Sequence, residues 1–274
     1  MTAALGSYRL LERIGEGSTA VVHRAVDSYG RTVAVKEPRL GVGPADETVR
    51  RRLAREIAVL GKIRSPYVVM LLDGDVTGDR PYVVTQYVAG VPLRDLVRTY
   101  GPLGGAALHR FAQRLAAALA AVHEAGVVHR DLTPANIMVV GGSPVVVDFG
   151  IAHEAAAAQT TRPGMLVGTP AYLAPELVEG ERATAASDVF AWAATLAYAA
   201  TGRPPFGAGS LHGVCDRILR GAADLDDVPE PLRSMVELGL RRDPAARPAA
   251  SWFAAALASW CGAPGAPAPA AVAG

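Results

Sequence analysis

The sequence has only two cysteines, Cys215 and Cys261, in 274 residues. Two cysteines cannot form a disulfide framework or supply a four-ligand zinc site, so we expect free thiols in a reducing cytoplasm. An excess of charge of one sign is also absent, because 27 basic and 26 acidic residues leave a net charge of +1. This balance gives no reason to expect nucleic acid or an anionic membrane as a partner.

Long hydrophobic runs are missing as well. The longest one, residues 189–200, is shorter than the roughly 20 residues that cross a bilayer, and it predicts a buried helix. The chain also starts without the basic stretch and apolar core of a signal peptide. We therefore expect a cytoplasmic chain with no membrane segment of its own, while a membrane-anchored parent protein stays open. Residues 262–274 are rich in Ala, Pro and Gly and predict a flexible tail or linker.

The first third of the chain has the pattern of a small antiparallel sheet with one helix. Half of all residues are hydrophobic, which is enough to bury two lobes. Runs of β-branched residues between glycine turns predict strands, and an apolar stripe at spacings of three and four predicts a helix. The predicted strands are residues 8–14, 20–26, 31–36, 68–72 and 81–88, and the predicted helix is residues 46–63.

Ala89-Gly90 interrupts this pattern, and the remaining chain is mostly helical. We predict an α+β fold: a small antiparallel β lobe plus one helix at residues 1–88, a larger helical lobe at 89–261 and a tail at 262–274. Ligand sites commonly lie between such lobes. Within the second lobe, the predicted helices include residues 187–200, 210–221, 231–241 and 249–260, and short strands flank Gly141-Gly142.

Two glycines, Gly15 and Gly17, lie between the first two predicted strands. Glycines in such a turn let backbone amides approach phosphate groups without a Cβ in the way. An ordinary hairpin turn explains two glycines equally well. The element that follows is a strand rather than a helix, which argues against a dinucleotide-binding fold.

Lys36 follows three apolar residues at the end of a predicted strand, and Glu56 borders the apolar stripe of the predicted helix. An internal pair between them would hold the ammonium group where it can contact phosphate oxygens. The alternatives are a solvated lysine and an ordinary surface carboxylate.

Three polar side chains, Asp131, Asn136 and Asp148, each lie at the edge of a short apolar segment. A loop carboxylate beside a buried segment is a candidate general base. An amide oxygen and a second carboxylate suit Mg²⁺, which prefers a few protein oxygens together with phosphates and waters. Each residue alone could be a helix cap or a turn residue, but the ordered set predicts phosphate chemistry.

In this order, the motifs resemble the eukaryotic-type (Hanks-type) serine/threonine protein kinases of bacteria, over about residues 8–261. Later runs agree, because residues 168–176 resemble the end of an activation segment and residues 241–248 resemble the closing motif of the family. The resemblance implies the bilobal protein kinase fold. It also implies transfer of the γ-phosphate of ATP to Ser/Thr hydroxyls of protein substrates.

The resemblance assigns a role to each polar residue. Lys36 contacts the α- and β-phosphates and pairs with Glu56, and Asp131 accepts the proton of the substrate hydroxyl. Asn136 and Asp148 hold Mg²⁺, for which Mn²⁺ is an alternative. Thr85 resembles the gatekeeper and is followed by the hinge. The residues implied to contact ATP are Ile14, Gly15, Glu16, Gly17, Val22, Ala34, Lys36, Thr85, Gln86, Val88 and Met138.

Thr133 departs from the family pattern, which usually has a lysine two positions after the catalytic aspartate. A hydroxyl keeps a hydrogen bond but lacks the positive charge near the γ-phosphate. Loss of one transition-state donor costs on the order of 10²–10³ in rate in other systems. Thr133 is therefore counted among the catalytic residues, and we expect a weaker kinase. The alternative is a pseudokinase scaffold with weak or no turnover.

The resemblance also implies regulation by phosphorylation. Thr160 and Thr161 lie in the polar stretch after Asp148, and we expect autophosphorylation at one or both, for which a transient homodimer would suffice. Arg52, Arg130 and His153 would receive the phosphate. A small-molecule phosphotransferase is a further alternative, but such enzymes generally lack the pair that Glu176 and Arg247 are expected to form.

Overall fold

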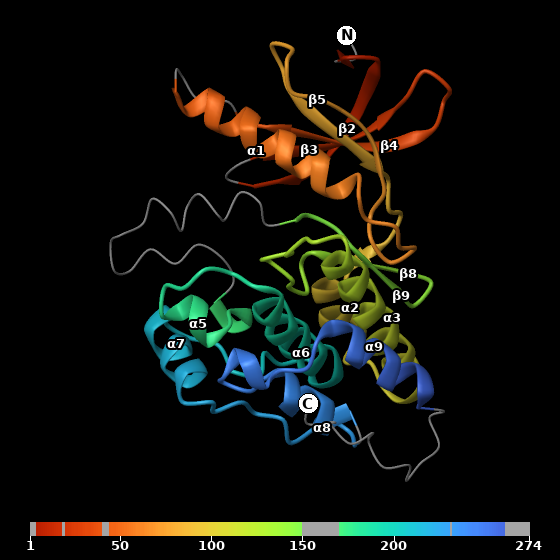
Figure 1. Ribbon diagram of the computed structural model, residues 1–274. Coiled ribbons are helices and arrows are strands. Elements are labelled where there is room, and N and C mark those ends of the chain that lie inside the picture. The colour runs from red at the N-terminus through yellow and green to blue at the C-terminus, as the bar shows by residue number, and fades with distance from the viewer. Residues whose placement is uncertain (1–3, 18–19, 40–43, 150–169, 231, 261–274) are drawn as a thin grey trace. The chain divides into compact units, whose positions relative to one another are not determined.

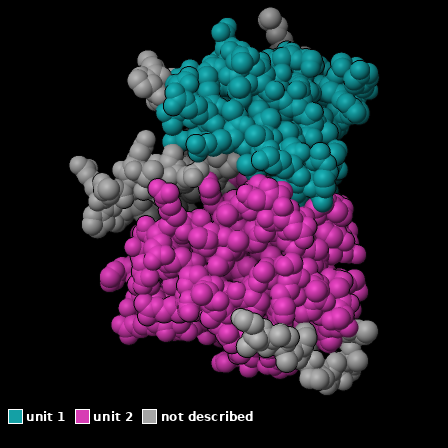
Figure 2. Space-filling view, in the orientation of Figure 1, with its two compact units in different colours: residues 1–64, 68–89 teal, residues 65–67, 90–274 magenta. Residues whose placement is uncertain are grey.

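The computed structural model describes residues 4–17, 20–39, 44–149, 170–230 and 232–260. The chain divides into two compact units, drawn in different colours in Figure 2. Residues 1–64 and 68–89 form the first unit, and residues 65–67 and 90–274 form the second. The first is built mainly of strands and the second mainly of helices (Figure 1), which confirms the predicted α+β fold class.

The first unit contains a six-stranded antiparallel sheet with the strand order β1-β2-β3-β4-β6-β5. The predicted strand at residues 68–72 was misplaced, because the strand begins at Leu71. Val68 and Val69 are buried in front of it, and apolar content alone does not distinguish packing from strand pairing. The strands are β1 (Ala4–Leu5), β2 (Tyr8–Glu16), β3 (Ala20–Val26), β4 (Thr32–Pro38), β5 (Leu71–Asp75) and β6 (Tyr82–Gln86).

Strand register decides which side chains share a face of this sheet. Lys36 pairs with Val22 on one side and with Val83 on the other, and Ala34 pairs with Thr85. Directly opposed residues point to the same face, and so do alternate residues of one strand. Val22, Ala34, Lys36, Val83 and Thr85 therefore share one face, which we call the lysine face. The opposite face contributes to a buried cluster of Leu5, Tyr8, Leu10, Ala25, Val33, Val35, Tyr82 and Val84.

Helix α1 (Pro44–Leu60) packs against β5 and β6 of this sheet (Figure 1). Leu53 and Leu60, on its apolar stripe, are buried. The helix ends earlier than the predicted residue 63, because Gly61 follows Leu60 and glycine is a poor helix former. The Gly61 N–H still donates to the carbonyl of Ile57, which closes the last turn.

The second unit is organised around helix α6 (Ala185–Thr201), which is buried throughout residues 187–200. The buried helix predicted for residues 189–200 is therefore confirmed. Its start is fixed by a reciprocal cap, in which the Thr184 hydroxyl accepts from the Ser187 N–H and Ser187 Oγ accepts from the Thr184 N–H. Its end is fixed by Gly202, whose φ of 75° is the left-handed conformation that glycine tolerates.

The other helices and a small sheet complete the second unit. Helix α2 was not predicted: it spans only eight residues, although Leu93 and Val97 are buried on one face of it. Among the described residues, no helix combines the length and the apolar character needed to cross a membrane. The elements are α2 (Leu93–Tyr100), α3 (Gly105–Glu124), α5 (Pro175–Val178), α7 (Leu211–Leu219), α8 (Leu232–Gly239), α9 (Ala250–Ser259), the 3₁₀ turns η2 (Pro170–Tyr172) and η3 (Pro244–Ala246), and strands β7 (Val91–Pro92), β8 (Ile137–Val140) and β9 (Ser143–Val146).

Candidate active site

Lys36 and Glu56 form an ion pair in the first unit. Lys36 Nζ donates to Glu56 Oε1 at 2.8 Å, and the two side chains are 24% and 11% exposed. A lysine this enclosed and hydrogen-bonded to a carboxylate is held in one place rather than moving freely in solvent. The pair fixes an ammonium group on the lysine face.

The residues implied to contact ATP occupy both units. Gly15 pairs with Val22 across β2 and β3, and Glu16 is the last residue of β2. Met138 lies in the second unit, on β8, where it pairs with Pro92 and Val145. Among the others, 44% of the surface of Ile14 is exposed. Gln86 is exposed and is the last residue of β6, and Val88 follows that strand.

Arg39 contacts the glycine turn between β2 and β3. Its Nε donates to the carbonyl of Gly17 at 3.3 Å, and its Nη2 pairs with Glu16 Oε1. Arg13 pairs with the other carboxylate oxygen of Glu16. Because all three side chains are substantially exposed, each pair is worth at most about 1 kcal/mol, so the turn is steadied rather than locked.

In the second unit, Asn136 orients the carboxylate of Asp131. Asn136 Nδ2 donates to Asp131 Oδ2 at 2.7 Å and to the backbone carbonyl of Asp131 at 2.9 Å. Both amide hydrogens are then used, so Oδ1 is the atom of Asn136 that remains to bind a cation. One side chain thus fixes a candidate base and presents an oxygen ligand.

Asp148 lies at the same end of the β8–β9 hairpin as Asn136. The Val147 N–H donates to the carbonyl of Asn136 at 2.9 Å, next to the strand pairing of Ile137 with Val146. Asp148 has a φ of 50°, in the left-handed region that non-glycine residues rarely adopt. Such strain is common at functional sites, and here it turns the chain sharply as it leaves the hairpin.

Asp188 on α6 clamps the loop that carries Asp131. Its carboxylate, 2% exposed, accepts from the backbone N–H of His129 at 2.7 Å and of Arg130 at 2.8 Å. The third partner is His123 Nε2 of α3, at 3.0 Å. Arg130 has a φ of 73°, so this anchor stabilises a strained backbone directly before Asp131. The sequence reasoning missed His123 and the anchoring role of Asp188, which contact the loop across 58 to 65 residues of sequence.

His129 is a fully enclosed part of the same loop. Burial lowers the pKa of His129 below its ordinary value, and the carboxylates of Asp188 and Asp131 oppose this only in part. The Asp131 N–H donates to His129 Nδ1 at 3.3 Å, so the neutral ring carries its proton on Nε2, 3.4 Å from the carbonyl of Val147. The ring packs against Phe149, with centroids 4.6 Å apart. It therefore joins the loop to the residues around Asp148.

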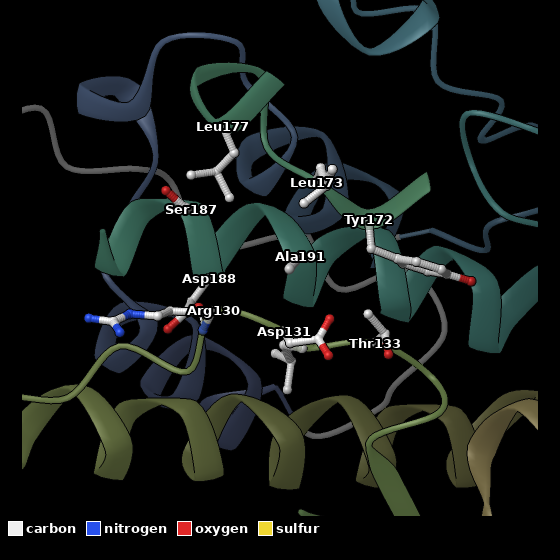
Figure 3. Close-up of a pocket in the computed structure, with 10 residues that line it drawn as sticks. Arg130, Asp131, Thr133, Tyr172, Leu173, Leu177, Ser187, Asp188 and Ala191 are labelled. Atoms are coloured by element: carbon white, nitrogen blue, oxygen red, sulfur yellow. Dashed lines mark hydrogen bonds between the residues drawn. The ribbon is translucent and has the colours of Figure 1, made fainter. Parts of the chain in front are cut away.

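Thr133 is buried, with 5% of its surface exposed. With Asp131 it lines a small hollow, partly open to solvent, under η2 and α5 (Figure 3). Among the described residues that line the hollow, Arg130 is the one cation, and Figure 3 shows its guanidinium directed away from the Asp131 carboxylate. Its remaining lining is made by Leu132, Tyr172, Leu173, Leu177, Ser187, Asp188 and Ala191.

Glu176 and Arg247 form a buried bidentate ion pair. The two N–H···O distances are 2.7 and 2.9 Å, and Ser187 Oγ donates to Glu176 Oε1 at 2.8 Å. Burial alone would raise the pKa of Glu176, but the hydrogen bonds from Arg247 and Ser187 outweigh it and lower that pKa. This pair fastens the end of the predicted activation segment to the loop before α9.

The predicted phosphate-binding residues are divided between the units and the undescribed chain. Arg52 lies on α1 in the first unit, and Arg130 lies in the second. Thr160, Thr161 and His153 fall outside the described residues.

Residues 8–258 match the protein kinase domain family, over most of the chain. The chain belongs to the protein kinase family. Among curated relatives, it is 37% identical over 255 residues to a probable serine/threonine-protein kinase, PkwA, of Thermomonospora curvata, covering 93% of this chain and 34% of that protein. It is 36% identical over 245 residues to the serine/threonine-protein kinase AfsK of Streptomyces coelicolor, covering 89% of this chain and 30% of AfsK. This kinase domain thus spans about a third of the length of these relatives.

A solved kinase structure supports the same fold. The crystal structure of Rad53 residues 1–466 in complex with AMP-PNP is similar to this kinase domain, with a TM-score of 0.76 and 25% sequence identity. The similarity covers 90% of this chain and 64% of that one. Both the sheet unit and the helical unit therefore follow the protein kinase fold, as the resemblance implied.

Proposed function

We propose that this kinase domain transfers the γ-phosphate of ATP to serine and threonine hydroxyls of proteins. The observation that carries the proposal is the fixed carboxylate of Asp131. Asn136 orients it at 2.7 Å, and Asp188 holds the backbone on its N-terminal side. A general base needs this kind of fixed geometry before its pKa matters.

In the reaction, a substrate hydroxyl loses its proton to the Asp131 carboxylate as its oxygen forms a bond to the γ-phosphorus of ATP. The bond between that phosphorus and the bridging oxygen breaks, and ADP leaves. Little covalent chemistry falls to the protein, so positioning and electrostatic stabilisation dominate the rate. The Lys36–Glu56 pair would contribute a fixed positive charge to the α- and β-phosphates.

The side chains of Asn136 and Asp148 fit a Mg²⁺ ion, with Mn²⁺ as an alternative. Asn136 Oδ1 remains after both amide hydrogens are used, and Asp148 follows the same hairpin end. Two protein oxygens suit a cation that keeps waters and phosphate oxygens as its other ligands. Mg²⁺ bound there would neutralise charge on the transferring phosphoryl group.

The proposal includes protein substrates and autophosphorylation at Thr160 or Thr161, by a transient homodimer. The relatives named as serine/threonine-protein kinases support the hydroxyl specificity. The buried Glu176–Arg247 pair argues against a small-molecule phosphotransferase. We also propose that the chain is located in the cytoplasm. Its proposed organisation is one lobe at residues 1–88, a second lobe at 89–261 and a tail at 262–274.

The test is a radiolabelled-ATP assay on the whole chain, wild type against Asp131→Asn. We expect label on the chain and on a general protein substrate with wild type, and a loss of at least about 100-fold with the variant. Phosphopeptide mapping should place the label on Thr160 or Thr161. Equal labelling by both proteins would refute the role of Asp131.

A pseudokinase scaffold is the second candidate, and Thr133 is the observation that favours it. Thr133 is buried and brings no charge to the hollow beside Asp131. In the same assay, Thr133→Lys should raise turnover on the order of 10-fold or more if the missing charge limits the rate. A scaffold would show no label in either protein, although nucleotide binding could persist.

A further inference from the structure

Position 74 of β5 needs a glycine because there is no room for a side chain, and not because of its backbone conformation. Its φ does not lie in the left-handed region that calls for glycine, unlike the turn glycines Gly30 and Gly141. A Cβ built on Gly74 would lie 2.5 Å from Ile57 Cδ1, 3.0 Å from Ile57 Cγ1 and 3.2 Å from the carbonyl oxygen of Tyr82. Carbon atoms in contact normally stay about 3.5–4.0 Å apart. Helix α1 therefore rests directly on the backbone of β5 at this position.

Gly74 belongs to the same row of the sheet as Lys36. Gly74 pairs with Val83 on β6, and Val83 pairs with Lys36 on β4. All three residues thus belong to the lysine face, and Gly74 is two strands from Lys36, a span of about 10 Å. Val83, between them, is 1% exposed. One row of the sheet carries both the lysine and the glycine.

Helix α1 contacts this row with two consecutive residues. Glu56 bonds to Lys36 at 2.8 Å, and Ile57 fills the space above Gly74. Because the two residues are adjacent on one helix, the height of Ile57 above β5 also sets the reach of Glu56. A second attachment fixes the helix along the β5–β6 turn, where Arg50 Nη1 donates to the carbonyls of Val76 and Gly78 at 2.7 Å each.

We infer that the Gly74–Ile57 contact positions α1 so that Glu56 reaches Lys36, which makes both residues positioning residues for phosphoryl transfer. The inference deepens the proposed function and rests on it for its effect on turnover. A β-branched side chain in a helix has one strongly preferred χ1, so Ile57 Cγ1 has little freedom to withdraw. A side chain at position 74 would then lift the helix, and Glu56 would lose its hydrogen bond to Lys36.

The test compares wild type with Gly74→Val, Ile57→Ala and the double variant, below the unfolding temperature of each. In Gly74→Val, we expect kcat/KM for ATP to fall about 10- to 100-fold, since displacements near 1 Å have effects of this size. The KM for the protein substrate should not change. The double variant should regain most of the lost kcat/KM, because alanine at position 57 clears the clash. Gly104→Ala is the matched control, since nothing lies within 4 Å of its added Cβ, and it should leave kcat/KM unchanged.

Wild-type kcat/KM in Gly74→Val, or no recovery in the double variant, would overturn the inference. A second measurement, of the unfolding midpoint, does not depend on turnover. It therefore distinguishes failure of this inference from failure of the proposed function. Glu56→Gln should lower the unfolding midpoint of the otherwise wild-type chain and leave that of Gly74→Val unchanged, because the ion pair is already broken there. An equal lowering in both backgrounds would overturn the inference even if the wild-type chain showed no kinase activity.

Discussion

Replacing Asp188 by asparagine tests how the catalytic loop is held. The wild-type carboxylate accepts hydrogen bonds from two backbone N–H groups, of His129 and Arg130, and also contacts His123. In Asp188→Asn, the amide oxygen can accept from one N–H, while the amide NH₂ group faces another donor. One buried N–H therefore loses its partner, and the remaining hydrogen bond loses its charge.

The magnitude follows from these contacts. Hydrogen bonds to charged groups contribute about 1.5–3 kcal/mol, and an unpaired buried donor costs about 1–3 kcal/mol. Arg130, at a φ of 73°, stores a further 1–2 kcal/mol or so that favours relaxation of the loop. We expect the free energy of unfolding to fall by about 2–4 kcal/mol. We also expect turnover to fall about 100-fold, because Asp131 follows the relaxed backbone.

Urea unfolding followed by tryptophan fluorescence gives the first quantity, and steady-state phosphorylation at low denaturant gives the second. Asp216→Asn is the matched control, because Asp216 is 45% exposed and pairs at 3.0 Å with Arg220, the residue that directly follows the same helix. That control should change stability by less than about 0.5 kcal/mol. If Asp188→Asn behaves like Asp216→Asn in both assays, the carboxylate is not what holds the loop.

Two further predictions concern stability. Arg247→Ala leaves the carboxylate of Glu176 buried without its partner and should lower the free energy of unfolding by about 3–5 kcal/mol. The control Arg242→Ala breaks an exposed pair and should lower it by less than about 1 kcal/mol. Equal losses in the two variants would contradict the burial argument. Because the pKa of His129 is lowered in the folded state, the unfolded chain binds more protons below pH about 6.5, and stability should fall there by up to about 1.4 kcal/mol per pH unit. Burial also lowers the pKa of His109, so His129→Asn should make the slope shallower without removing it in urea titrations at pH 5–7, and an unchanged slope would contradict the assignment.

The parts of the fold that sequence reasoning predicted are those with a local signal. Runs of β-branched residues and glycine turns predicted the strand that carries Lys36, and the apolar stripe around Leu53 predicted α1. The apolar run at residues 189–200 predicted α6, because a helix that is apolar all round must be buried. Errors fell where two local signals are alike, as at Val68 and Val69, which are buried ahead of the first residue of β5.

The long-range attachments were not predictable from local pattern. Asp188 looked like the acidic first turn of a helix, and nothing in its neighbours indicates that it accepts hydrogen bonds from residues 58 and 59 positions earlier. The glycine at position 74, which lies between Asp73 and Asp75, was not singled out from the sequence. Its reason, the side chain of Ile57, appears only when α1 is placed on β5. Sequence gives the chemical groups, whereas their distances depend on packing between elements far apart in the chain.

Thr133 shows how the magnitudes decide between a weak kinase and an inactive scaffold. The loop geometry does not depend on the missing charge, because the hydrogen bonds that Asn136, Asp188 and His129 make around Asp131 do not use the Thr133 side chain. Positioning of this kind can account for about 7–11 kcal/mol of a reaction barrier, whereas one missing transition-state donor costs about 2.7–4 kcal/mol. On this reasoning we expect the larger contribution to be retained and the smaller one to be reduced. A lowered kcat with an unchanged KM for the protein substrate is the expected consequence, since the missing charge acts on the transferring phosphate and not on substrate binding.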